Sequence, residues 1–237
     1  MGTIKKGILG GFSGKVGTVI GGSWNSISYM RSLADSYSDA KMEKQVCQRG
    51  RFAAVVAFLK TITPYLRVGY RNCEAGQSPY SSATSYVLRN AVEGCGDEAV
   101  VNFSKALVSQ GSLAGVTDAA VEVAGGKASF TWTDNSGVGN AAADDAAMVL
   151  AYNKDRSEAV YDLQAATRVD GAAELVLPAT WSDEALAVYL SFQSVSNRSV
   201  SKSVCLQDDE VSQQPGGGEE SGTGGSGTGT GGDGSFG

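Results

Sequence analysis

Two spacings of apolar residues divide the chain. Between about residue 40 and residue 91, apolar residues recur every three or four positions, which predicts helices. The first such stripe is formed by Phe52, Val55, Val56, Leu59, Ile62 and Leu66. From Ala99 to Leu206 the period is two, which predicts short strands. In the opening residues, apolar residues also alternate with small or polar ones, so we expect strands there.

Proline and glycine set the expected helix boundaries. Proline interrupts a helix but suits its first turn, so Pro64 predicts the end of one helix and the start of another. We expect Thr63 to cap this second helix, which would run to about Asn72. A serine-proline pair at Ser78 opens a third helix, which the glycines at 94 and 96 would end.

The glycine-rich opening predicts a β-hairpin. Residues 16–20 and 24–30 alternate apolar with small or polar residues, and Gly21-Gly22 between them fits a tight turn.

The second half reads as an antiparallel β-sandwich, because seven short strands separated by turn residues occupy about ninety residues. The predicted strands are 121–123, 128–133, 146–152, 159–163, 173–177, 186–193 and 199–206. We expect Trp132 and Tyr189 to lie in the core between its two sheets.

The fold class predicted is therefore α+β. Residues 1–98 form a basic module of a glycine-rich hairpin and about three helices, and residues 99–207 form a sandwich similar to fibronectin type III or immunoglobulin domains. Residues 208–237 include twelve glycines and few apolar residues, which predicts a disordered acidic tail.

Charge is distributed unevenly over these parts. Residues 1–75 carry 11 Lys or Arg against 4 Asp or Glu, residues 76–207 carry 8 against 15, and residues 208–237 carry none against 6. A basic module with interleaved aromatic residues is typical of proteins that bind nucleic acid. It also suits contact with acidic parts of the same chain or of a neighbour. Both interpretations stay open, with the second favoured.

Several kinds of chemistry find no support in the residues. The chain contains no histidine, which excludes hydrolases with a histidine base and histidine-containing zinc sites. The segment around Lys15 resembles a phosphate-binding loop but has Leu9 where its first glycine belongs and Val16 where Ser or Thr should follow the lysine. Acidic residues fall mainly in turns. We therefore expect no catalytic residues, cofactor, metal or small-molecule substrate.

The four cysteines, Cys47, Cys73, Cys95 and Cys205, lie too far apart for a CxxC pair. Their spacing favours free thiols in a reducing compartment. No apolar stretch is long enough to span a bilayer, and the N-terminus lacks the uninterrupted apolar region of a signal peptide. A cytoplasmic location is expected by default, and release by a non-classical route stays open.

These observations favour a non-enzymatic structural or interaction protein that associates with itself or docks on a protein partner through its basic module. The alternative is a nucleic-acid-binding protein of a mobile element that uses the same module. The residues expected to contact the partner are Lys15, Trp24, Tyr29, Arg31, Arg49 and Arg51.

Several motifs in a fixed order resemble those of a family of uncharacterised proteins from gut Bacteroidota. They are GILGGFSGKVGTVIGGSW at residues 7–24, a K-x-E-x-Q-x-x-x-R-x-R-F segment from Lys41, SQGSL from Ser109 and FTWTDNSG from Phe130. The resemblance spans about residues 2–207 and implies no catalytic residues, since the family is a domain of unknown function. Members usually carry an R-x-x-P pattern, whereas this chain has Ala34 three residues after Arg31.

Overall fold

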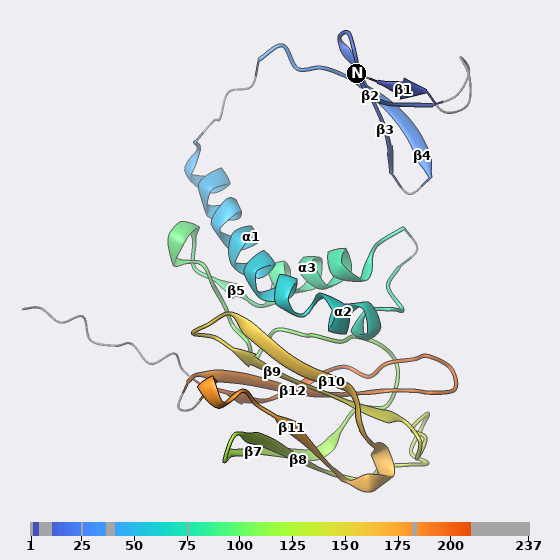
Figure 1. The fold of residues 1–237 in the computed structure, drawn as a ribbon, viewed down its shortest axis with the longest axis vertical. Helices are drawn as coiled ribbons and strands as arrows, with labels where there is room; N and C mark the ends of the chain where they lie inside the picture. The colour runs from blue at the N-terminus through green and yellow to red at the C-terminus, as the bar shows by residue number, and fades with distance from the viewer. Residues whose placement is uncertain are drawn as a thin grey trace, which may run out of the picture.

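A computed structural model describes residues 2–4, 11–24, 26–36, 41–74, 76–181 and 184–209. Within these residues the fold is α+β, with three α-helices and several antiparallel sheets (Figure 1). The tail predicted to be disordered, residues 208–237, lies outside the described residues apart from its first two.

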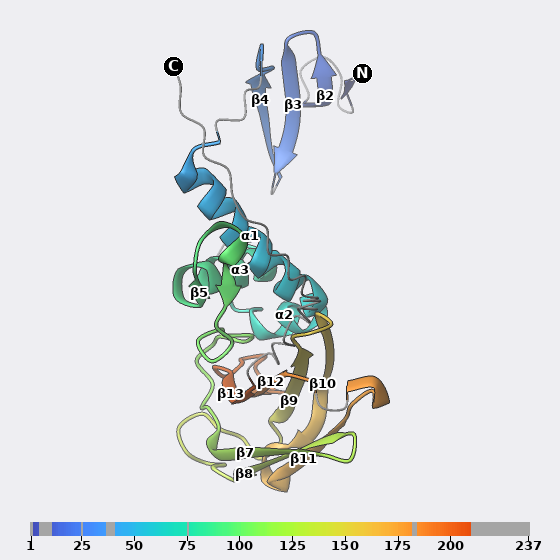
Figure 2. The same cartoon turned by 90° about the vertical axis from the view of Figure 1, so that its left-hand side faces the viewer.

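A four-stranded antiparallel sheet opens the chain. Its strands run in the order β1 (Thr3–Ile4), β2 (Phe12–Val16), β3 (Val19–Trp24) and β4 (Ile27–Ser32). The predicted turn at Gly21-Gly22 is wrong, because both glycines lie inside β3. The chain turns instead at Gly17, whose positive φ of 57° suits glycine. Both views show this sheet beyond the N-terminal end of the first helix (Figures 1 and 2).

Three helices follow, namely α1 (Glu43–Thr61), α2 (Thr63–Gly69) and α3 (Pro79–Asn90). Ser78 caps α3 as predicted, because its hydroxyl accepts a hydrogen bond from the Ser81 amide. Thr63 does not cap α2. It is the first residue of that helix, and its hydroxyl donates to the Lys60 carbonyl at 2.9 Å. The second and third helices also end earlier than predicted, at Gly69 and Asn90.

A short hairpin of β5 (Val92–Glu93) and β6 (Val100–Val101) connects the helices to two larger sheets. One sheet has the order β10-β9-β12-β13, and the other has the order β11-β8-β7. The strands are β7 (Thr117–Ala124), β8 (Lys127–Thr133), β9 (Ala146–Asn153), β10 (Glu158–Thr167), β11 (Ala172–Val176), β12 (Leu186–Gln193) and β13 (Val204–Asp208).

The four-stranded sheet of β9, β10, β12 and β13 is the middle of three layers (Figures 1 and 2). Every residue of β9 and β12 is buried. Alternate residues serve two cores, since Met148 and Leu150 pack with the helices whereas Val149 packs with the three-stranded sheet. The helices therefore share a core with this sheet. That residues 1–98 and residues 99–207 fold as separate units stays a prediction.

The two aromatic residues expected between the sheets lie on opposite sides of the middle layer. Trp132 lies between the sheets, as predicted, where its ring meets Phe192 edge-on at 5.6 Å between centroids. Tyr189 faces the helices, and its hydroxyl donates to the Phe103 carbonyl at 2.8 Å. Its predicted position is wrong, because a strand buried on both faces gives no alternation from which to tell its two sides apart.

Candidate functional site

Four of the six residues predicted to contact a partner lie on one face of the N-terminal sheet. Residues directly opposite one another in an antiparallel pair share a face. Lys15 lies opposite Ile20, and Ile20 lies opposite Arg31. The other residues of this face follow by alternation along the strands. We call it the cationic–aromatic face, and its side chains are Lys15, Ile20, Trp24, Ile27, Tyr29 and Arg31.

The cationic–aromatic face is open to solvent. Trp24 is 65% exposed, Ile27 is 66% exposed and Tyr29 is 48% exposed. Lys15 and Arg31 are exposed too, and neither forms an ion pair with a described residue. Two cations with no ion-pair partner among the described residues therefore share one face with two aromatic rings, an arrangement suited to an anionic surface that also offers flat groups for stacking.

The opposite face of the same sheet has different chemistry. It carries Phe12, Val16, Val19 and Met30 together with glycine and serine, and no charged residue. We call it the uncharged face. The glycine at 21 belongs to it, because a Cβ there would lie 2.6 Å from the Phe12 ring. Val16 and Met30 are 52% and 71% exposed.

The N-terminal sheet has no core of its own in the described structure. Neither hydrophobic cluster of the described structure includes a residue of β1, β2, β3 or β4. Among the residues of these strands whose burial is described, Gly21 alone is buried. Small sheets are stable when one face is covered by other elements. On the uncharged face Phe12 packs over Gly21, so the cationic–aromatic face is the surface of this sheet that is suited to contact with something else.

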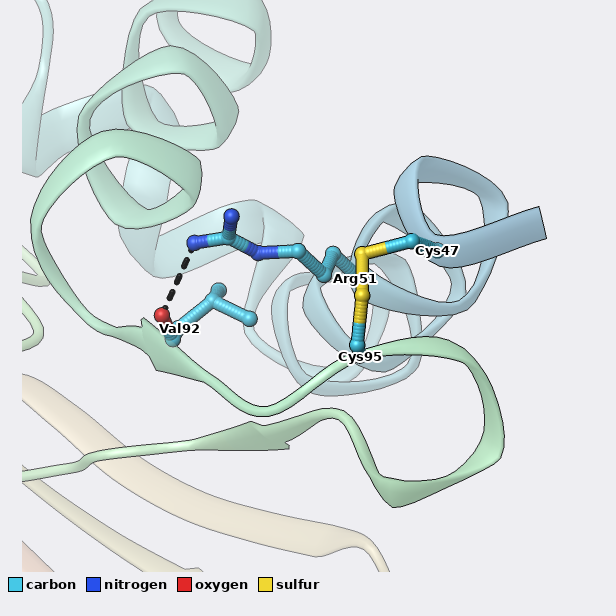
Figure 3. The surroundings of a disulfide bond; sticks show 4 residues. All are labelled: Cys47, Arg51, Val92 and Cys95. Atoms are coloured by element: carbon cyan, nitrogen blue, oxygen red, sulfur yellow. Dashed lines mark hydrogen bonds between the residues drawn. A yellow bond between two sulfur atoms is a disulfide. The ribbon is translucent and has the colours of Figure 1, made fainter. Parts of the chain in front are cut away.

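The remaining two predicted residues lie on α1, apart from this face. Arg49 is exposed. Arg51 is partly buried and donates from Nη2 to the Val92 carbonyl at 2.9 Å (Figure 3). The structure thus gives Arg51 a contact within the chain, and a role for either arginine in partner binding stays a prediction.

A disulfide joins Cys47 of α1 to Cys95, with 4.6 Å between their Cα atoms (Figure 3). The expectation of free thiols is wrong for these two residues and right for Cys73 and Cys205. Next to the disulfide, Gly50 is packed so closely on the loop that a Cβ there would lie 1.9 Å from the Gly96 carbonyl oxygen. The disulfide, the glycine contact and the Arg51 hydrogen bond together fix the first half of α1 to β5 and the loop that follows it.

The described residues contain no group of three cysteine, aspartate or glutamate side chains arranged to hold a metal ion. A surface cavity of about 500 Å³ beside α3 has a single carboxylate, that of Glu74, in its lining. A second cavity of about 510 Å³ is likewise lined by one carboxylate, that of Asp162. Neither offers the two facing carboxylates that an acid–base pair requires.

Within the described ranges, no single helix is both long and apolar enough to cross a membrane. The helices α1 and α2 meet the length and composition requirement only as a pair, with a bend of 87° between them.

The match to a family model spans residues 11–207, which includes the N-terminal sheet, the helices and both larger sheets. The chain belongs to the family of unknown function DUF6266. Comparison of this DUF6266 chain with curated proteins and with solved structures gives no significant match. The cationic–aromatic face lies inside the region that the family model covers.

Sequence reasoning missed Ile20 and Ile27 on the cationic–aromatic face of the DUF6266 chain, as well as the whole uncharged face. The alternation of residues 12–32 contains this signal, but a turn at Gly21-Gly22 gives the wrong strand pairing. A turn centred on Gly17-Thr18 gives the observed pairing of Val16 with Val19, from which both faces follow.

Proposed function

We propose that this DUF6266 protein is a non-enzymatic interaction protein that docks on acidic protein surfaces through its cationic–aromatic face. The observation that carries the proposal is the placement of Lys15, Trp24, Tyr29 and Arg31 on one exposed face of a sheet. Two cations attract an acidic surface, and exposed aromatic rings add contact area at low entropic cost.

The chain itself contains acidic regions that fit this face. Residues 76–207 have 15 acidic against 8 basic residues, and residues 208–237 have 6 acidic residues and no basic one. A second copy is therefore one acidic partner that the face can bind. Such an association depends on opposite charges, so it should weaken as salt screens them.

Size-exclusion chromatography with light scattering, at about 20 mM and about 500 mM salt, tests this association, because the Debye length falls from about 20 Å to about 4 Å. We expect a larger mass at low salt that decreases at high salt. The double variant Lys15→Glu with Arg31→Glu should abolish the low-salt increase. Arg89→Glu with Lys202→Glu is the matched control, since both residues are exposed cations elsewhere. A wild-type monomer at both salt concentrations would contradict self-association.

Binding of nucleic acid is the second candidate, as for a protein of a mobile element. Exposed aromatic rings beside cations are the contacts that single strands use, with bases stacked on the rings and phosphates near the cations. Trp24 and Tyr29 favour it. The test is a titration of the full chain with a labelled single-stranded oligonucleotide in a salt series. Absence of binding at low salt would eliminate this candidate.

We also propose that residues 99–207 form a fibronectin type III-like sandwich. We propose in addition that the N-terminal sheet is a structural unit built from glycine-rich hairpins. The strand orders β11-β8-β7 and β10-β9-β12-β13 support the sandwich, because the first, second and fifth strands form one sheet and the other four form the second. An experimental structure with β11 in the other sheet would contradict it. A Bacteroidota source is proposed from the four motifs that resemble those of that family.

A further inference from the structure

The outer edge of β4 is open to pairing with a strand from another molecule. β4 is the last strand of the N-terminal sheet and pairs with β3 alone (Figure 2). In an antiparallel edge strand, every second residue directs its amide and carbonyl groups away from the neighbouring strand. All six residues of β4 are exposed, and within the described ranges no backbone hydrogen bond reaches its outer edge. These groups therefore remain available as donors and acceptors.

The other sheet edges carry features that hinder such pairing. Proteins commonly protect edge strands by making them short, by interrupting them with bulges or by placing charges on them. Of the other edge strands in the described structure, β1, β5 and β6 have only two residues each. The pairing of β7 and of β10 with their neighbours includes a register shift. In addition, β7, β10, β11 and β13 each carry at least one carboxylate, which repels an acidic partner.

The edge of β4 has none of these features. The strand pairs with β3 from Ile27 to Ser32 without a register shift. Its sequence, ISYMRS, contains no proline, and Arg31 is its only charged residue. A cation at this edge attracts an acidic partner. Among the described edge strands of more than two residues, β4 is therefore the one that a strand with acidic side chains can join.

We propose that the acidic partner binds as an extended segment that adds a further strand at the outer edge of β4. This inference rests on the proposed function and states how the partner is held. Hydrogen bonds between the two backbones contribute affinity, and alternate side chains of the added strand contribute specificity. Because side chains alternate between the two faces of a sheet, every second residue of the partner extends the cationic–aromatic face.

The two faces of β4 define the sequence pattern of the partner. On the cationic–aromatic face, Tyr29 and Arg31 lie next to the added strand, and opposite charges on neighbouring strands attract. On the other face, Ser28, Met30 and Ser32 offer no charge. The partner is therefore an extended segment in which acidic and uncharged residues alternate. The β4 strand of a second copy does not fit this description, because it has no acidic residue.

The first test compares two labelled peptides of the same composition at about 20 mM salt, where charged contacts are little screened. Acetyl-Glu-Val-Glu-Thr-Glu-Val-amide alternates acidic and uncharged residues, whereas acetyl-Glu-Glu-Glu-Val-Thr-Val-amide has them in two blocks. As a strand, only the first peptide directs all of its carboxylates to one face. In fluorescence anisotropy with the full chain, we expect the alternating peptide to bind at least about 5-fold more tightly.

N-methylation separates backbone pairing from side-chain contact. Methyl groups on the Glu amides of the alternating peptide block one edge of the added strand, and methyl groups on its Val and Thr amides block the other edge. Each methylated peptide is the matched control for the other, because their charges are identical. We expect one of them to bind at least about 10-fold more weakly than the unmodified peptide and the other to bind about as tightly.

Hydrogen exchange of the full chain gives the readout on the protein. With the alternating peptide bound, every second amide of β4 should exchange at least about 10-fold more slowly, and the amides of β7 should be unchanged. Equal binding of the alternating and block peptides, or equal effects of the two methylations, would overturn the inference and leave docking on the cationic–aromatic face untouched. Unchanged exchange in β4 while the peptide is bound would do the same. If no peptide binds at low salt, the proposed docking on acidic surfaces fails, and this inference fails with it.

Discussion

The ring of Tyr29 lies across Gly22 so closely that a Cβ on Gly22 would be 2.9 Å from Tyr29 Cζ. The two residues are direct partners in the β3–β4 pair. Glycine in a strand often marks a site where another group approaches closely. Gly22 thus leaves room for the tyrosine ring to lie over β3 on the cationic–aromatic face, where it forms part of the proposed contact surface.

Replacing Gly22 with valine should therefore displace the Tyr29 ring. We expect Gly22→Val to reduce low-salt association at least about 5-fold, a loss of roughly 1 kcal/mol for one aromatic contact. Light scattering at low salt measures it. Gly115→Ala is the control, because a Cβ at Gly115 meets nothing within 4 Å. Unchanged association in Gly22→Val would show that the position of this ring is irrelevant to docking.

Arg168 connects three segments inside the body of the protein. Its side chain is fully buried, pairs with Asp145 at 3.1 Å and donates to Asn135 at 2.6 Å, and its guanidinium lies 3.9 Å from the centre of the Phe192 ring. Burial lowers the pKa of Arg168, although Asp145 opposes this effect. The arginine therefore depends on its partners to remain buried in its charged form.

We expect Arg168→Met to cost about 3–5 kcal/mol of unfolding free energy, because it leaves the buried Asp145 without its cation. Denaturant unfolding measures the loss. Arg156→Met, which breaks the partly exposed pair with Glu184, should cost only about 1 kcal/mol. Equal losses in the two variants would contradict the role given to Arg168.

The Cys47–Cys95 disulfide closes a loop with a sequence separation of 48 residues. Loss of such a link commonly destabilises a protein by about 2–4 kcal/mol. We expect Cys47→Ser with Cys95→Ser to show this loss and faster hydrogen exchange in the first half of α1. Cys73→Ser removes a free thiol and is the control. Unchanged exchange in α1 would contradict the anchoring role of the disulfide.

The Cys47–Cys95 disulfide also has a consequence for the redox state of the compartment in which the protein folds. Such links are rare in reducing compartments, so the disulfide favours an oxidising compartment over the cytoplasm expected from the sequence. Rapid alkylation of thiols in intact cells, followed by mass spectrometry, should find Cys47 and Cys95 protected and Cys73 labelled. If all four cysteines are labelled, the protein resides in a reducing compartment.

Asp208 links the last strand to the rest of the body at neutral pH. Burial alone would raise the pKa of Asp208, but hydrogen bonds from Lys154 and Ser104 outweigh it and hold the pKa below its usual value. A lowered folded-state pKa stabilises the protein above the unfolded-state pKa of about 3.9, and this stability is lost as pH falls through the folded-state value.

Asp208→Asn should therefore be less stable than the wild type at pH 7, by about 1–2 kcal/mol for lost charged hydrogen bonds on a partly exposed group. The difference should shrink as pH falls below about 4. Denaturant unfolding at several pH values measures it. A difference that is constant with pH would show that the Asp208 charge does not contribute.

Parts of the fold followed from the sequence because local spacing determines them. The strand at Leu186–Gln193 has the predicted bounds, and Ser78 caps its helix as expected. The face that Tyr189 occupies was not predictable, since every neighbour in its strand is buried. The pairing of Cys47 with Cys95 depends on helix packing across a long separation, which spacing along the chain does not reveal.

Residue types along the chain indicate most of the candidate site, and strand pairing supplies its geometry. Lys15, Trp24, Tyr29 and Arg31 stood out as cations near aromatic residues, and strand pairing places them on one face. The two arginines of α1 had the same signal, but Arg51 bonds to the Val92 carbonyl. Charge alone cannot separate a cation that binds a partner from one that completes a hydrogen bond inside the chain.

The three indole N–H groups of the full chain offer the most direct test of docking. Trp24 is exposed on the cationic–aromatic face, whereas the Trp132 indole donates to the Arg168 carbonyl at 2.8 Å and that of Trp181 to Glu158 at 3.4 Å. In an NMR titration with a polyglutamate peptide at low salt, we predict that the Trp24 signal alone shifts and that added salt reverses the shift. A Trp24 signal that does not respond, or equal shifts of all three signals, would contradict the proposed surface.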